Sequence, residues 1–418
     1  MFIKISHINY KESYKSFIDT LDREQGFEVF FELLARVLSV FIFPLLYLIL
    51  AFVNIFIKVK IGFLFNRRLG HLAFNTDLFL RRRQLGIIPS NTYFLFFSYR
   101  PANKQLVKMF GRNINIINSE FLTKLVAPIG FFATRFWQPL PFNSNEYLEF
   151  TKADRTLFFT DNEEVLGKKE LKKMGLKKDD WFVCIFARDD EYTSIKFPTT
   201  NNARANHRNS DIDSYTDAIK YIIDKGGFVI RTGYKVAKEI EYKHKNMIDY
   251  AVHYRSDFMD VYLAANCKFY IGTSAGGSDM AHIFDTPFVG INYMPIGYAP
   301  FGKNEIYIPK NVYYKNTCKQ VSFERQINLL DNLKVSLGDC PEEIMDKMGI
   351  NLINNTPEQI LSVTQEMFLR LNGAFENNVE YKNKLLIFNN ILNNSTSLGK
   401  KIKHRVGSDF LIRMKLNE

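Results

Sequence analysis

The sequence of 418 residues contains few of the patterns that build metal centres or disulfide frameworks. Its four cysteines lie far apart and have no paired metal-ligand spacing; they are Cys184, Cys267, Cys318 and Cys340. The sequence also lacks an HExxH segment and a CxxC pair, which argues against a zinc peptidase and a zinc ribbon. We therefore expect reduced, mostly buried thiols in a cytosolic compartment.

Hydrophobic residues make up 46% of the chain and charged residues 24%, which suits a folded protein of two domains with appendages. The formal net charge of +11 implies an anionic partner: nucleic acid, an acidic membrane surface or a phosphate-bearing substrate. The densest basic residues closely follow a long apolar run; they are Lys58, Lys60, Arg67, Arg68, Arg81, Arg82 and Arg83. This placement favours a membrane-proximal face over nucleic-acid binding.

That apolar run, residues 38–57, holds 20 residues without a charge, the length needed to cross a bilayer. It starts too far from the N-terminus for a signal peptide and lacks a small-residue cleavage site. Pro44 and Asn54 interrupt it, so a kinked, shallow or re-entrant insertion stays open, as does a buried core helix. If the run enters a membrane, the basic flank after Ile57 keeps the main body on the cytoplasmic side. Residues 27–38 suit an amphipathic lead-in helix.

The region after the apolar run alternates between strand-like and helical patterns. Three apolar runs predict strands over residues 59–65, 93–97 and 114–117, and a helical pattern ends near Gln84. This alternation predicts a parallel sheet covered by helices. The charged stretch 146–178 fits the solvated face of a linker helix, with lysines at 168, 169, 172, 173, 177 and 178.

A second α/β pattern follows. It predicts strands over residues 181–187, 227–231, 269–271 and 287–291, and helices over 210–224 and 257–265. Thr356, Pro357 and Gln359 predict the capped start of a helix that ends near Leu371. The fold class is therefore α/β, with two facing doubly wound, Rossmann-like domains and an N-terminal apolar helix. The expected parts are a membrane-associating segment, an α/β domain with a linker, a second α/β domain, and a helical basic tail, over 1–57, 58–178, 179–345 and 346–418.

The segment FYIGTSAGGSDMAHIFDTP, residues 269–287, joins an apolar strand to a helix through a loop of small residues. Gly272, Gly276 and Gly277 allow close approach of backbone amides, and Thr273 and Ser274 add hydroxyl groups. Together with the following helix N-terminus, this loop suits a diphosphate bound without a metal ion. Its spacing is neither the Rossmann fingerprint nor a Walker loop, so an ordinary tight turn is the alternative.

Three arginines fall at or near predicted strand ends or loops: Arg188, Arg208 and Arg231. A guanidinium group there can clamp a phosphate and stabilise a leaving diphosphate, although each arginine can also be structural. Asp211 and Asp213 form an Asp-x-Asp pattern, which we interpret as a helix cap rather than a metal site.

His71 lies in a loop after the first predicted strand, where a neutral imidazole can accept a proton from a hydroxyl group. The alternative is a loop histidine that bonds to the backbone. Asp257 precedes the glycine loop and can bond ribose or sugar hydroxyls, although helix capping explains it equally well. His282, on the helix after the loop, suits packing or polar support better than acid–base chemistry.

Several segments together resemble a family of bacterial glycosyltransferases that are found with lipopolysaccharide, O-antigen and capsule genes and are similar to fucosyltransferase-like enzymes of the GT-B fold. The segments are RRLGHLAFNTDLFLRRR, the strand that ends at Arg188, HRNSDIDSYTDAIKYIIDKGGFVIRTG and SDFMDVYLAANCKFYIGTSAGGSDMAHIFDTPFVGIN. The resemblance covers roughly residues 59–292. It implies a nucleotide-sugar donor held by the C-terminal half, an acceptor held by the N-terminal half, and metal-independent transfer.

The resemblance assigns residues to three motifs. Arg68, Gly70 and His71 match the first-loop motif, and Asn75 beside them is expected on the acceptor side. The central motif is matched by Arg208, Asn209, Asp211, Tyr215, Arg231 and Gly233. The nucleotide-side loop is matched by Gly272, Thr273, Ser274, Gly276 and Asp279.

The sequence thus favours a glycosyltransferase that acts without a cofactor or metal, with inversion, on a glycan or lipid-linked acceptor. His71 is the expected base, Arg208 and Arg231 act in catalysis, and Arg188 contacts the donor. We expect the protein on the cytoplasmic face of the bacterial inner membrane, in contact with membrane lipids but not with nucleic acid. The alternatives are a nucleotide-sugar epimerase of the same fold and a non-catalytic membrane scaffold in polysaccharide assembly.

Overall fold

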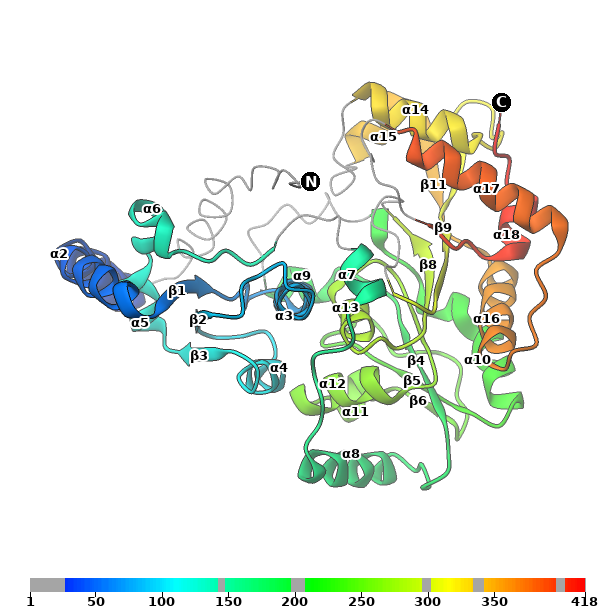
Figure 1. Ribbon diagram of the computed structural model, residues 1–418. Helices are drawn as coiled ribbons and strands as arrows, with labels where there is room; N and C mark the ends of the chain where they lie inside the picture. The colour runs from blue at the N-terminus through cyan, green and yellow to red at the C-terminus, as the bar shows by residue number, and fades with distance from the viewer. Residues whose placement is uncertain are drawn as a thin grey trace. The chain divides into compact units, whose positions relative to one another are not determined.

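The computed structural model describes residues 27–141, 147–196, 207–294, 302–333, 342–395 and 403–417. The chain divides into two compact units, Met1–Phe142 and Asn143–Glu418, and each contains a parallel sheet with flanking helices (Figure 1). This arrangement confirms a mixed α/β fold. The charged stretch that was expected to close the first domain belongs to the second unit.

Among its described residues, the first unit is built on three parallel strands in the order β1-β2-β3. The strands are β1 (Lys58–Phe63), β2 (Thr92–Ser98) and β3 (Asn115–Asn118). Its later helices are a π-helix (His71–Asn75), α3 (Thr76–Gln84), α4 (Lys104–Phe110), α5 (Glu120–Val126), α6 (Ile129–Phe132) and a 3₁₀-helix (Thr134–Phe136). Phe79 of α3 packs edge-on against Phe94 and Phe96 of β2, at ring distances of 5.1 and 5.0 Å. The three strands predicted for this half are confirmed.

Helix α2 (Phe27–Phe56) begins where the amphipathic lead-in was expected and continues through Pro44. Residues 37–56 form one helix that is long and apolar enough to cross a membrane, by length and composition. Only 11% of that stretch is buried, which is too little for the core helix that was one interpretation of the sequence. Asn54 closes the helix: its side chain donates to Leu50 O (2.8 Å) and accepts from Val59 N (3.0 Å), so the chain enters β1 at once.

The second unit contains, among the residues described, a six-stranded parallel sheet in the order β6-β5-β4-β7-β8-β9. Its strands are β4 (Phe182–Phe186), β5 (Phe228–Arg231), β6 (Met247–Ile248), β7 (Tyr270–Gly272), β8 (Phe288–Tyr293) and β9 (Glu305–Pro309). The chain runs outward from β4 to β6 and then returns to β7, which pairs with the other side of β4. The strand order therefore reverses between β4 and β7, the position where open α/β sheets bind ligands.

Helices cover both faces of this sheet, with α10 and α16 on one side and α12 and α13 on the other (Figure 1). The helices up to α13 are α7 (Tyr147–Lys152), α8 (Asp161–Lys173), α9 (Glu191–Lys196), a 3₁₀-helix (Ile212–Tyr215), α10 (Thr216–Asp224), α11 (Tyr250–His253), α12 (Asp257–Asn266) and α13 (Gly276–Ile283). A capping box of Thr160 and Glu163 begins α8, and the six lysines between 168 and 178 are exposed, as expected.

The C-terminal region folds onto the second unit. It contains an antiparallel pair, β10 (Asn311–Tyr314) and β11 (Ile350–Ile353), and the helices α14 (Phe323–Leu333), α15 (Glu342–Met348), α16 (Pro357–Leu371), α17 (Val379–Asn393) and α18 (Ser408–Arg413). Thr356 and Gln359 form the predicted capping box of α16, which ends at Leu371 as expected. Because α16 packs against α10, this region completes the layer of helices on one face of the sheet.

Candidate functional site

The loops that leave β4 and β7 meet at the point where the strand order reverses. The backbone N–H of Arg188, after β4, donates to Oγ1 of Thr273, after β7, over 3.2 Å. Thr273 is fully buried, and its carbonyl oxygen accepts from the Ser278 hydroxyl at 2.7 Å. These bonds hold the two loops and the first turn of α13 in one arrangement.

Two glycines of this loop, Gly272 and Gly277, are required by packing. A Cβ atom on Gly272 would lie 2.4 Å from Oγ of Ser278, and a Cβ atom on Gly277 would lie 2.9 Å from the ring of Phe186. The start of α13 can therefore approach the end of β4 closely. Ala275 caps the helix and supplies no side-chain acceptor, so the helix N-terminus presents its amides without a polar side-chain cap. A helix end of this kind favours an anion.

Two buried cationic side chains lie beside this loop pair, and Asn209 joins them. Nη1 of Arg188 contacts Oδ1 of Asp190 at 3.1 Å and also donates to the side-chain oxygen of Asn209. The amide nitrogen of Asn209 in turn donates to the other carboxylate oxygen of Asp190, at 2.7 Å. The backbone oxygen of Asn209 accepts from Nζ of Lys310 at 2.8 Å. Arg188 and Asn209, both predicted from sequence, are therefore brought together.

Lys310 was not predicted from sequence. Its ammonium group donates to Asn209 O and to Oδ1 of Asn354 (2.6 Å), and both acceptors are neutral. The residue is only 6% exposed. Burial, and after it the positive charge of Arg188, lowers the pKa of Lys310 to about 8. The arginines were identified because they lie at the ends of predicted strands. Lys310 directly follows β9, which the sequence pattern did not predict as a strand, so the same signal did not identify Lys310.

A second polar group lines α13. Asp279 is half-buried, and its pKa is raised to about 6 by burial, while His282 and Arg208 oppose the shift. His282 itself is buried and its Nδ1 lies 2.8 Å from Oε1 of Glu305. Packing or polar support was the interpretation of His282 from the sequence, and this contact agrees with polar support. Arg208 and Asp279, from separate predicted motifs, are thus electrostatic neighbours.

Arg231, predicted to act in catalysis, is held in a buried ion pair. It is 1% exposed, and its Nη1 lies 3.1 Å from Oδ1 of Asp249. The second oxygen of Asp249 accepts from the backbone N–H of Ile240 at 3.1 Å. Gly233, two residues further on, has φ +157°, and a Cβ atom there would lie 2.8 Å from Val236. Both residues therefore help to fix the conformation of the loop after β5.

The Asp-x-Asp pattern binds a lysine. Asp211 caps the 3₁₀-helix by accepting from Asp213 N at 3.2 Å, as the helix-cap interpretation predicts. The ammonium group of Lys238 lies 2.9 Å from Oδ1 of Asp211 and also contacts Asp213. Among the residues that the structure describes, no group of three potential metal-ligating side chains is present.

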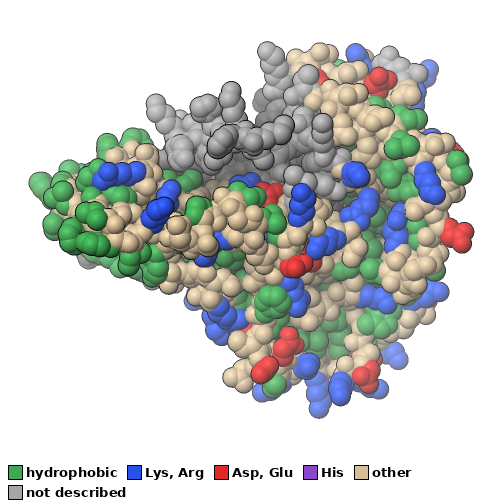
Figure 2. Space-filling view, viewed as in Figure 1, with side chains coloured by type: hydrophobic (Ala, Val, Ile, Leu, Met, Phe, Trp, Pro, Cys, Tyr) green, Lys and Arg blue, Asp and Glu red, His purple; other side chains and the backbone are tan. Residues whose placement is uncertain are grey.

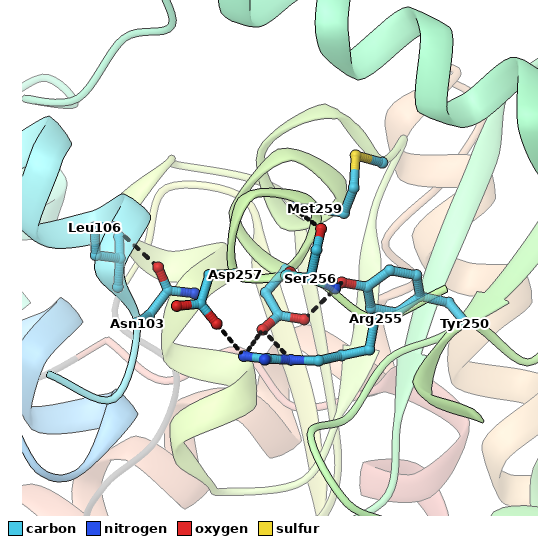
Figure 3. Close-up of polar contacts among 8 residues, drawn as sticks. Asn103, Leu106, Tyr250, Arg255, Ser256, Asp257 and Met259 are labelled. Carbon is cyan, nitrogen blue, oxygen red and sulfur yellow. Dashed lines mark hydrogen bonds and ion pairs between the residues drawn. The ribbon is translucent and has the colours of Figure 1, made fainter. Parts of the chain in front are cut away.

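Asp257 belongs to an ion cluster at the start of α12 (Figure 3). Its Oδ1 lies 2.6 Å from Nη2 of Arg255, which also contacts Oδ2 of Asp260 at 2.8 Å. The hydroxyl group of Tyr250 lies 2.8 Å from the other oxygen of Asp260, whose pKa burial raises to about 6. Ser256 caps the helix by accepting from Met259 N. The cluster explains Asp257 without a ligand.

In the first unit, His71 opens the π-helix, and π-helical turns are frequent at functional sites. Nδ1 of His71 lies 3.2 Å from Oδ1 of Asn75, and the Asn75 amide donates to the backbone oxygen of Pro141. The imidazole also packs edge-on against Phe65. Gly70 precedes the π-helix and Arg68 is exposed. His71, the predicted base, and Asn75, predicted on the acceptor side, are therefore in direct contact.

No protein-family model matches the chain, and a search of curated proteins finds no similar sequence. Solved structures with a similar course of the chain include a glycosyl transferase of family 9 from Veillonella parvula, with 11% identity, a TM-score of 0.46, and coverage of 75% of this chain and 98% of that one. The ADP-heptose lipopolysaccharide heptosyltransferase II of E. coli shares 12% identity over 60% of this chain and 90% of that one, with a TM-score of 0.39. At such values the likeness carries no argument about activity.

Proposed function

We propose that this protein is a glycosyltransferase and that the second unit binds the diphosphate of a nucleotide-sugar donor. The observation that carries the proposal is the pair Arg188 and Lys310, bridged by Asn209 at the edge where the strand order reverses. A buried ammonium group whose acceptors are both neutral is stabilised by an anion. Reversal points of open α/β sheets bind nucleotides, so a nucleoside diphosphate fits the place and the charge.

The same groups supply what glycosyl transfer requires. When the bond between the anomeric carbon and the diphosphate breaks, negative charge develops on the leaving oxygens. Arg188 and Lys310 neutralise this charge from their side chains, and the amides at the start of α13 add their dipoles. We therefore propose transfer that needs neither a metal nor a cofactor, with the nucleoside diphosphate as leaving group.

We propose His71 as the base that accepts the proton of the acceptor hydroxyl. If Nδ1 carries the proton that is shared with Asn75, then Nε2 is the basic nitrogen of the ring. The hydroxyl oxygen attacks the anomeric carbon, its proton passes to Nε2, and the diphosphate departs, which inverts the anomeric centre. The acceptor is a glycan or a lipid-linked sugar of the bacterial surface, and the basic residues after α2 support a place on the cytoplasmic face of the inner membrane.

The affinity for a nucleoside diphosphate is expected to fall as the pH rises above about 8. Lys310 loses its proton near this pH, and an anion that binds the ammonium form raises the pKa of the complex. Binding is therefore full below pH 8 and weakens by up to about tenfold per pH unit above it. Isothermal titration calorimetry across this range measures the slope. Lys310→Arg is expected to flatten it, because a guanidinium group does not titrate there; an unchanged slope would assign the titration to another group.

Transfer is tested by incubating the detergent-solubilised protein with a panel of nucleotide sugars and a membrane-lipid extract. Release of free nucleotide and incorporation of sugar are followed with and without EDTA. Lipid-dependent, EDTA-resistant incorporation is expected. Conversion of the donor without incorporation would indicate an epimerase, and a folded protein that binds no donor would indicate the scaffold.

His71→Gln is expected to reduce sugar incorporation by roughly 100-fold or more while donor affinity stays unchanged, because general base catalysis contributes 10²–10⁴-fold. His253→Gln, at an exposed histidine of α11, is the matched control and should retain full activity. Full transfer by the His71 variant would refute its role as base.

A further inference from the structure

The side of α2 that faces away from the first unit is a continuous apolar surface, and Figure 2 shows hydrophobic side chains gathered over this helix. Phe41, Leu48, Phe52 and Ile55 are 75, 64, 64 and 72% exposed. At 100° per residue these four positions fall on one stripe of the helix. A stripe of large apolar side chains this exposed calls for a covering partner.

The opposite side of α2 is packed on the protein itself. Phe43 contacts Phe132 of α6 at a ring distance of 5.8 Å, and Tyr47 contacts Phe136 at 5.5 Å. Leu50 joins the same core cluster. The middle of the charge-free stretch is therefore attached along its length to the first unit. Phe132 is 71% exposed and its neighbour Phe131 48%, so the apolar surface continues from α2 onto α6.

This packing decides between a helix that crosses the membrane and a helix that lies in its plane. Tyr47 lies near the centre of the stretch 37–56, so in a crossing helix it would lie near the middle of the bilayer. The guanidinium group of Arg135 lies 4.8 Å from the centre of the Tyr47 ring, and Arg135 is exposed. A crossing would carry this charge and the polar surface of the first unit into hydrocarbon, which is strongly unfavourable for a charged side chain.

We propose that α2 lies in the plane of an anionic lipid bilayer without crossing it. Its outer stripe, together with Phe131 and Phe132, enters the headgroup and upper acyl region. Two exposed cations at the edge of the apolar surface favour an anionic membrane as its partner. They are Arg135, beside Tyr47, and Lys58, directly after the helix. Such cations pair with lipid phosphates at headgroup depth. This attachment is independent of the proposed transferase activity.

Binding is tested by flotation of the full chain with vesicles of phosphatidylcholine, with and without phosphatidylglycerol. The chain is expected to float with the anionic vesicles, and the double variant Phe41→Glu, Phe52→Glu to float at least tenfold less. The matched control is Val379→Glu, Leu386→Glu, which changes two exposed apolar residues of α17 and should float like the parent protein. Equal flotation of both variants would overturn the proposal, as would a stable dimer by light scattering that binds no vesicles.

The depth of α2 in the bilayer is tested with a fluorophore on single cysteines at positions 41, 48, 52 and 55, after Cys318 and Cys340 are replaced by serine. Quenching by lipids brominated at different acyl positions reports the depth of each label. An in-plane helix is expected to place all four labels at one shallow depth. A crossing helix would spread positions 41 and 55 by about 21 Å along the normal, at 1.5 Å per residue, and that result would overturn the in-plane arrangement.

Discussion

Lys310→Met is expected to weaken binding of a nucleoside diphosphate by roughly 10- to 150-fold, because a hydrogen bond to a charged group contributes about 1.5–3 kcal/mol. Methionine keeps most of the side-chain volume and removes the charge, so the fold is expected to persist. The ammonium group meets only neutral oxygens, Asn209 O and Asn354 Oδ1, among the contacts described. Its charge is therefore available to a ligand. Titration calorimetry with uridine, adenosine and guanosine diphosphates measures the loss.

The matched control is Lys303→Met, at an exposed lysine that pairs with the exposed Asp154. This variant should bind nucleotide like the parent protein. Thermal unfolding of both variants separates a binding defect from a folding defect. If a folded Lys310→Met protein kept its affinity for nucleoside diphosphates, the assignment of the diphosphate site to Lys310 and Arg188 would be refuted.

Arg231→Met is expected to lower the free energy of unfolding by about 3–5 kcal/mol, since it leaves Asp249 buried without its partner. The two side chains are 2 and 5% exposed, so water cannot replace the lost contact. The pair also positions the loop after β5, because Asp249 accepts from the backbone N–H of Ile240. Urea unfolding followed by circular dichroism measures the change.

Lys243→Met provides the surface comparison, because Lys243 pairs with Glu239 where both side chains are more than half exposed. Its effect should be much smaller than that of Arg231→Met, because water and salt screen an exposed pair. Adding Asp249→Leu to Arg231→Met should recover part of the loss, since no buried charge then remains. A small effect of Arg231→Met on stability, accompanied by a large loss of donor binding, would instead support the catalytic role predicted from sequence.

The hydrophobic periodicity of the sequence correctly predicted most of the helices and strands that carry the candidate site. The run that became β4 is apolar over its whole length, as strands buried on both faces are, and the runs that became β2 and β8 are mostly apolar. Capping residues predicted the start of α16 correctly, because the capping box is a local interaction within four residues. Strands β6 and β9 were missed. Strand β6 has only two residues, which is too short to show a hydrophobic period. Strand β9 is recognised as a strand only through its pairing with β8.

The candidate site was predictable where it follows a strand and not where it depends on pairing between distant charges. Arg188 and Thr273 follow predicted strands, and the structure joins their loops by a hydrogen bond. Arg231 also ends a predicted strand, but its partner Asp249 lies 18 residues away in sequence and was not foreseen. A position at the end of a predicted strand therefore identified both Arg188, which lies beside the proposed donor site, and Arg231, which lies in a buried ion pair.

The sequence by itself determined the α/β class, the strands that meet at the reversal point, the glycine loop before α13 and the apolar helix near the N-terminus. These follow from periods, caps and charge, which act over a few residues. Only the tertiary structure decided that Lys310 joins Arg188 through Asn209, that Arg231 pairs with Asp249, and that α2 packs one face on α6. Each of these depends on burial and on contacts between segments far apart in the chain, and no local pattern records them.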